Sequence, residues 1–149
     1  MPTDPYLADL LKENFYVRKS PVLGRLTVIL RGHLEQRGLE LIPQRSRVVA
    51  AGEVHELLVV DEPRAGPGQV VNRVAALGFL EFLTSGVLLV GDEVLVNDQG
   101  VGHLAGYDLT HMPNHMNFVI AVPRAVSGEE LGVELGATVK FIMPSPVGR

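Results

Sequence analysis

Cysteine is absent from the 149 residues of the chain, and so is tryptophan. Without cysteine there can be no disulfide, no thiolate nucleophile and no cysteine-ligated zinc or iron–sulfur centre. Aromatic residues make up only 5% of the chain, whereas a surface that binds nucleic acid usually combines a basic face with aromatic side chains. Any metal site must therefore rely on histidine and carboxylate side chains.

Long apolar runs are missing as well. No uninterrupted apolar segment approaches the roughly 20 residues that a membrane-spanning helix needs, and the N-terminal sequence MPTDPYLADLL lacks the basic start of a signal peptide. We therefore expect a cytoplasmic protein without membrane contact. Hydrophobic residues still make up 46% of the chain, which predicts strands buried on both faces or a subunit interface. A homo-oligomer, most simply a dimer, is expected.

Charge is unevenly distributed along the chain. Residues 1–47 hold eight Lys and Arg against five Asp and Glu, a balance of +3, and residues 48–149 hold five against twelve, a balance of −7; together they give the net charge of −4. The basic residues of the first part are spread out and are interpreted as solvated surface. Because the remaining two thirds are acidic, we expect no nucleic-acid partner.

The pattern of apolar residues predicts a single, mainly β domain. Asp4-Pro5 is a typical helix start, and the leucines that follow at helical spacing predict a short amphipathic helix over residues 5–15. Residues 1–20 are therefore expected to be a helical extension and residues 21–149 the body of the domain. The spacing of the strands in that body favours a meander or a small barrel, closed or partly open.

The expected strands are short apolar runs bounded by Gly, Pro or polar residues. Residues 20–37 contain features of both helix and strand, and we favour strand. The remaining predicted strands are Leu39–Ile42, Arg47–Ala51, Val54–Val60, Val71–Phe82, Val87–Val90, Glu93–Val96, Phe118–Val122 and Thr138–Met143.

The segment Gly102–Asn117, GHLAGYDLTHMPNHMN, holds three of the five histidines. Pro113 lies between His111 and His115, so the two imidazoles cannot share one helix face, and in a strand they would stand about 13 Å apart. A turn centred on Pro113-Asn114 instead predicts a loop at which metal ligands converge. The candidate ligands are His103, Asp108, His111 and His115, and they suit zinc, iron or manganese as the cofactor.

Two alternatives to a metal site stay open for this segment. In the first, Asp108 and Thr110 cap backbone groups and the loop is purely structural. In the second, a metal-free pocket binds a small organic ligand. The candidate ligand-binding residues are His55, Tyr107, Asn114 and Asn117.

A second polar cluster surrounds His55, in the sequence Gly52-Glu53-Val54-His55-Glu56. A histidine near a carboxylate can form an acid–base pair, although such pairs are also common on protein surfaces. Strand alternation places His55 and Glu56 on opposite faces. The sequence does not decide whether any reaction is catalysed.

The run from Gly78 to Phe141 contains GFLEF, SGVLLVGDEV, AGYDLTHMPNH and ELGATVKF. It resembles a group of uncharacterised bacterial β-barrel proteins, a resemblance that implies the fold and no activity. Residues Gly91–His115 also resemble the small subunit of bacterial 2-amino-4-ketopentanoate thiolase, in a Gly-Asp-x-Val strand followed by Gly-x-Leu and a histidine. The catalytic residues of the thiolase have no counterparts that can be placed on this sequence.

Two hypotheses of function follow. The first is a β-barrel that binds a small ligand or a metal ion through the loop 102–117. The second is a non-catalytic interaction subunit that docks onto a larger enzyme through apolar surface and the N-terminal helix.

Overall fold

The computed structural model describes residues 18–144, which form a mainly β structure as the sequence predicts. The predicted helix over residues 5–15 lies outside the described residues. Within them, no helix has the length and apolar character needed to cross a membrane. The strands are β1 (Val22–Ile29), β2 (His33–Leu34), β3 (Leu39–Glu40), β4 (Ser46–Val49), β5 (Val54–Val60), β6 (Val70–Val71), β7 (Val74–Phe82), β8 (Gly86–Leu89), β9 (Glu93–Val96), β10 (Gln99–Asp108), β11 (Asn117–Ala121) and β12 (Thr138–Ile142), and the helix is α1 (Gly128–Leu131).

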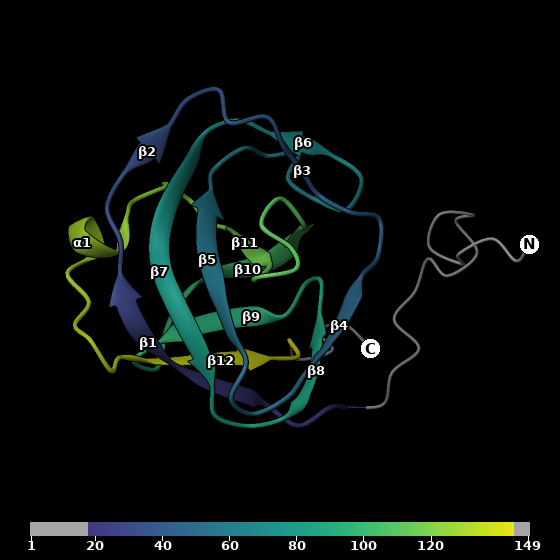
Figure 1. Ribbon diagram of the computed structural model, residues 1–149, viewed down its shortest axis with the longest axis vertical. Coiled ribbons are helices and arrows are strands. Elements are labelled where there is room, and N and C mark those ends of the chain that lie inside the picture. The colour runs from purple at the N-terminus through teal and green to yellow at the C-terminus, as the bar shows by residue number, and fades with distance from the viewer. Residues whose placement is uncertain (1–17, 145–149) are drawn as a thin grey trace, which may run out of the picture.

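The main sheet closes on itself. Its strand order is β1-β12-β9-β10-β11-β5-β7-β2, and β1 also pairs with β7, so the pairings form a ring. In Figure 1, β5 and β7 run across the direction of β9 and β12. The ring is not a simple meander, because β5 and β11 are far apart in sequence and pair in parallel. Two small antiparallel pairs, β3–β6 and β4–β8, lie outside this sheet.

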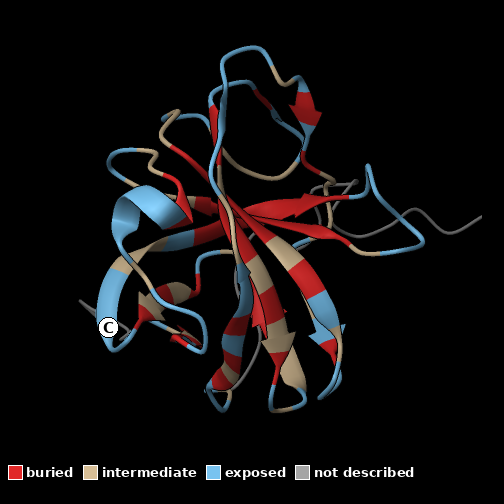
Figure 2. Cartoon of the chain, turned by 60° about the vertical axis from the view of Figure 1, so that its left-hand side comes forward, coloured by how far each residue is buried: buried red, intermediate tan, exposed pale blue. Residues whose placement is uncertain are grey.

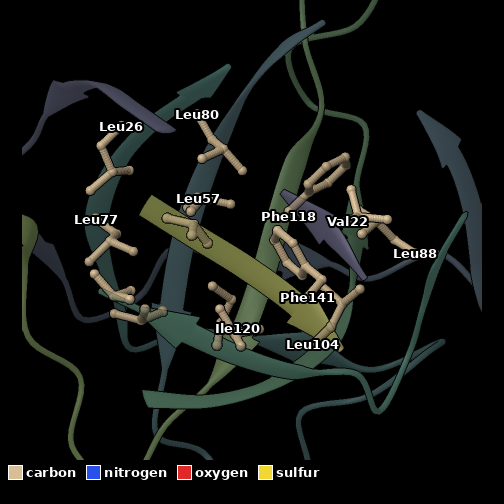
Figure 3. Close-up of a cluster of buried hydrophobic side chains, with 14 of the residues drawn as sticks. Val22, Leu26, Leu57, Leu77, Leu80, Leu88, Leu104, Phe118, Ile120 and Phe141 are labelled. Atoms are coloured by element: carbon tan, nitrogen blue, oxygen red, sulfur yellow. The ribbon is translucent and has the colours of Figure 1, made fainter. Parts of the chain in front are cut away.

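The larger hydrophobic cluster gathers side chains from strands all around the ring. Val22, Leu57, Phe118 and Phe141 are among its fully buried members, and Figure 3 shows such side chains converging from different strands. The alternating burial of β9 and β12 reflects this single inward face. Exposed residues gather at the loops (Figure 2).

A second, smaller cluster covers the other face of β5. Leu57 and Val59 belong to the larger cluster, whereas Leu58 and Val60 pack with Leu39 and Val119 in the smaller one. Because both faces of β5 are covered, its residues 57–60 are buried without alternation. This accounts for part of the high apolar content of the sequence.

Strand β10 corrects one expectation. The segment from Gly102 was expected to be a loop, but Gln99–Asp108 is a continuous strand paired with both β9 and β11. Its glycines serve close packing: a Cβ atom on Gly102 would lie 2.1 Å from the carbonyl oxygen of Ala121. The loop of the histidine-rich segment is therefore confined to residues 109–116.

The helix α1 was not predicted, although its start has a recognisable signal. Ser127 caps the helix by accepting a hydrogen bond from the Glu130 N–H, and the Glu130 carboxylate accepts one from the Ser127 N–H. This reciprocal pair is the capping box that the spacing Ser-x-x-Glu predicts.

Gly78 of β7 occupies a crowded point of the ring between β1 and β5. A Cβ atom there would lie 2.2 Å from the carbonyl oxygen of Val28, so backbone would have to move. We expect Gly78→Ala to lower the free energy of unfolding by about 1–3 kcal/mol, measured by urea denaturation. Gly66→Ala is the matched control, because its Cβ would meet nothing closer than 3.8 Å. Equal stability of the two variants would contradict this account.

Candidate metal centre

Asp108 and Asn117 form the base of the loop 109–116. They are opposite each other in the β10–β11 ladder, and Asn117 Nδ2 donates a hydrogen bond of 2.8 Å to Asp108 Oδ2. The Thr110 N–H and hydroxyl also donate to the Asp108 carboxylate, over 3.0 and 2.9 Å. Asp108 is buried, and its oxygens are engaged in holding the loop.

The loop contains a tight turn from His111 to Asn114. The N–H groups of Asn114 and His115 both donate to the His111 carbonyl oxygen, over 3.0 and 3.3 Å, and the Met112–Pro113 peptide is cis. This turn begins one residue earlier than expected, because Asn114 is the first donor to the His111 carbonyl. It brings the His111 and His115 rings into a stack, with 5.0 Å between their centroids.

Met116 connects the end of the loop to β5. Its N–H donates to His55 Nδ1 over 3.0 Å, and its carbonyl oxygen accepts from the Glu56 N–H over 3.1 Å. His55 points inward and Glu56 outward, as strand alternation predicts. We call these two hydrogen bonds of Met116 the joint between the loop and β5. The joint places the Glu56 side chain beside His115.

Glu56, His111 and His115 form a cluster in which one potential ligand atom of each residue lies within 4.8 Å of the other two. His115 Nε2 is 3.5 Å from Glu56 Oε1, and both side chains are 15% exposed. His111 is exposed, so the cluster is open to solvent on that side. Two imidazoles and one carboxylate are a donor set that binds zinc or non-haem iron and leaves coordination positions open.

Asn114 decides which nitrogen of His115 carries the proton. The amide oxygen Oδ1 of Asn114 lies 2.8 Å from His115 Nδ1 and can only accept, so Nδ1 carries the hydrogen. Nε2 then presents a lone pair. It is buried and has no hydrogen-bond partner within residues 18–144. In the neutral imidazole a lone pair and a carboxylate oxygen thus face each other, as in a metal site where a ligating histidine donates its second N–H to a neighbour. In the protonated imidazole, the same contact is an ion pair with Glu56.

His55 belongs to the interior and not to this cluster. Its Nδ1 accepts from Met116, so the proton sits on Nε2, which donates to Glu53 Oε1 over 2.8 Å. Burial lowers the pKa of His55 below its ordinary value of 6.5, and the contact with Glu53 only partly offsets this. Burial raises the pKa of Glu53, but hydrogen bonds from His55 and from the Ala50 N–H outweigh it, with a net lowering.

The structure places His103 and Tyr107 apart from the cluster. His103 is opposite Glu93 and Ala121, and it is five residues along β10 from Asp108, roughly 17 Å. Tyr107 is fully buried in the larger hydrophobic cluster, where its hydroxyl donates to the Leu88 carbonyl oxygen over 3.1 Å. Of the four predicted metal ligands, the structure therefore brings together only His111 and His115.

Glu56 is the member of the cluster that sequence reasoning did not assign to it. The sequence assigns Glu56 only to the polar cluster around His55, whereas the structure places it beside a histidine 59 positions later. The parallel β5–β11 pairing produces this contact, and nothing local in the sequence signals it.

Comparison with known proteins places the chain in a family. Residues 16–142 match DUF6917, a family of unknown function. The chain belongs to this family. No curated protein and no solved structure matches it, so the chemistry has to be argued from the residues of the cluster.

The Met116–His55 contact gives a stability prediction. His55→Leu leaves the buried Met116 N–H without an acceptor, which costs about 1–3 kcal/mol of unfolding free energy. His103→Ala, at an exposed position, is the control and should change stability by no more than about 0.5 kcal/mol. Chemical denaturation at pH 7.5 measures both, and a His55→Leu protein as stable as the control would contradict the assigned role.

The lowered pKa of His55 also predicts a pH dependence. Below pH 6.5 the unfolded chain takes up a proton on His55 that the folded chain does not, so acidification favours unfolding. The stability contributed by neutral His55 is complete above pH 6.5 and declines as the pH falls towards the lowered pKa. Metal-free wild-type protein should lose more stability than His55→Leu between pH 7 and pH 5. Parallel profiles of the two proteins in a denaturation series would disprove this.

Proposed function

We propose that this protein binds one divalent transition-metal ion through Glu56, His111 and His115. The observation that carries the proposal is the convergence of the three ligand atoms within 4.8 Å of one another. The chain segments that bear them, β5 and the loop 109–116, are connected by the backbone hydrogen bonds of Met116. Zinc, iron and manganese are the candidate ions.

The immediate surroundings of the cluster support this proposal. Asn114 holds His115 in the tautomer that a metal ligand requires. Phe79 packs edge-on against the His115 ring, with 5.0 Å between centroids, and limits its rotation. The ligand side chains are thus largely positioned before an ion arrives, which reduces the entropy that binding would otherwise cost.

The chemistry that such a centre supports follows from its open side. Three protein ligands leave positions for water or for a small molecule, and a bound divalent ion acidifies that water or polarises a carbonyl group. A cavity of about 550 Å³ lies along the first part of the loop, lined partly by Ile42, Asp108, Leu109 and Thr110. In this proposal the ring of strands acts as a small β-barrel that presents the centre on its outer face.

The interaction-subunit hypothesis rests on the N-terminal residues, which lie outside the described part of the chain. It stays a prediction, as do the homodimer, the cytoplasmic location and the likeness to the thiolase subunit.

Metal binding is tested by titrating chelator-treated full-length protein with zinc, iron(II) or manganese(II) and measuring heat and thermal unfolding. We expect one ion per chain and a stabilisation of about 2.7 kcal/mol when the free ion is at 100 times its Kd. Glu56→Gln and His115→Ala should each weaken binding at least about 10-fold, since each removes a direct ligand.

His103→Ala is the matched control, because it removes an exposed histidine that lies away from the cluster. It should bind the ion as the wild type does. An unchanged thermal transition with all three ions, or a loss of affinity in His103→Ala as large as in His115→Ala, would overturn the proposal.

A further inference from the structure

Asn117 is a buried polar residue whose hydrogen-bonding capacity is only half used. Its side chain is 1% exposed, and Nδ2 donates to Asp108. Its carbonyl oxygen Oδ1 is buried and has no hydrogen-bond partner in the described part of the chain. Buried acceptors of this kind are rare, because the loss of hydration is uncompensated. The unpartnered oxygen is therefore available to a ligand or to a buried water molecule.

The strand register places Asn117 next to Glu56, a member of the proposed centre. Asn117 and Glu56 are direct partners in the parallel β5–β11 pair, so their side chains share the outer face of the sheet on strands about 4.8 Å apart. Asp108 is the partner of Asn117 on the opposite side, in β10. Since Nδ2 is bound to Asp108, Oδ1 is turned away from that carboxylate.

Three acceptor groups thus belong to residues that adjoin one another at the β5–β11 pair and the end of the loop. His115 Nε2 presents a lone pair, Glu56 presents a carboxylate, and Asn117 presents an amide oxygen. Two of these groups have an orphaned buried atom, His115 Nε2 and Asn117 Oδ1. A single cation among them would satisfy all three, whereas a further acceptor would satisfy none.

We propose that Asn117 Oδ1 is a fourth protein ligand of this centre, and that the centre takes a six-coordinate ion of the manganese(II) or iron(II) type. This rests on the metal binding proposed above. Two imidazole nitrogens and two oxygens form a harder donor set than the ligands of most tetrahedral zinc sites, and amide oxygen favours manganese more than zinc. The exposed side at His111 leaves two positions of an octahedron for water or a small ligand.

The test compares manganese(II) with zinc in full-length protein freed of metal. Manganese affinity is measured by the loss of the electron paramagnetic resonance signal of the free ion, and zinc affinity by competition with a chromogenic chelator. Asn117→Ala should lower manganese affinity at least 10-fold and zinc affinity less than 3-fold, so that the ratio of the two affinities changes.

Asp108→Asn is the matched control for the structural contact between residues 108 and 117. It alters that contact but leaves the Asn117 amide in place, so manganese and zinc affinities should change by similar factors. The double variant Asp108→Asn, Asn117→Asp exchanges amide and carboxylate across the same contact. It keeps an oxygen at position 117, so its manganese affinity should exceed that of Asn117→Ala and return towards that of the wild type. Where Asn117→Ala does not fold, the double variant decides the question.

The outcomes separate the two proposals. If neither ion binds the wild type, the metal centre itself is wrong. If binding depends on Glu56 and His115 but Asn117→Ala leaves the manganese-to-zinc ratio unchanged, Asn117 is not a ligand and the three-residue centre stands. Failure of the double variant to restore manganese affinity would also overturn the role of Asn117.

Discussion

The candidate centre depends on how Met116 is held against β5. Its N–H is bound by the His55 imidazole and its carbonyl by the Glu56 N–H. The end of the loop is therefore held at a fixed position along the parallel β5–β11 pair. His115 immediately precedes this joint, and Glu56 is part of it. Without the joint, a carboxylate and a histidine from distant parts of the sequence would have no reason to meet.

The joint also connects the centre to the hydrophobic interior. His55 packs against Phe118, with 4.9 Å between ring centroids, and its second nitrogen is bound to Glu53. Arg47 contacts Glu53 and also donates to the sulfur of Met116. These contacts of His55, Glu53 and Arg47 thus fix the backbone from which the outward-pointing Glu56 and His115 side chains project.

Local patterns predicted the mainly β fold and most of the strands, since β5 and β9 are alternating or continuous apolar runs with clear boundaries. They failed at β10, where glycines that permit close strand contact look like loop residues. Pro113 correctly excluded a helix containing both His111 and His115. The partner of these histidines could not be predicted, because Glu56 reaches them only through a parallel pairing of residues 61 positions apart, Glu56 and Asn117.

Asp108 shows why composition alone is a poor guide to ligands. It lies near the histidines in sequence and carries the right functional group, yet its oxygens accept hydrogen bonds from Thr110 and Asn117. Glu56 is bound through its backbone, and within residues 18–144 its carboxylate pairs only with His115. A carboxylate whose hydrogen bonds are already made gains little from a cation, while one that faces a lone pair gains much. The hydrogen bonds that each carboxylate already makes, and not its distance in sequence from the histidines, therefore favour Glu56 over Asp108 as the carboxylate of the candidate centre.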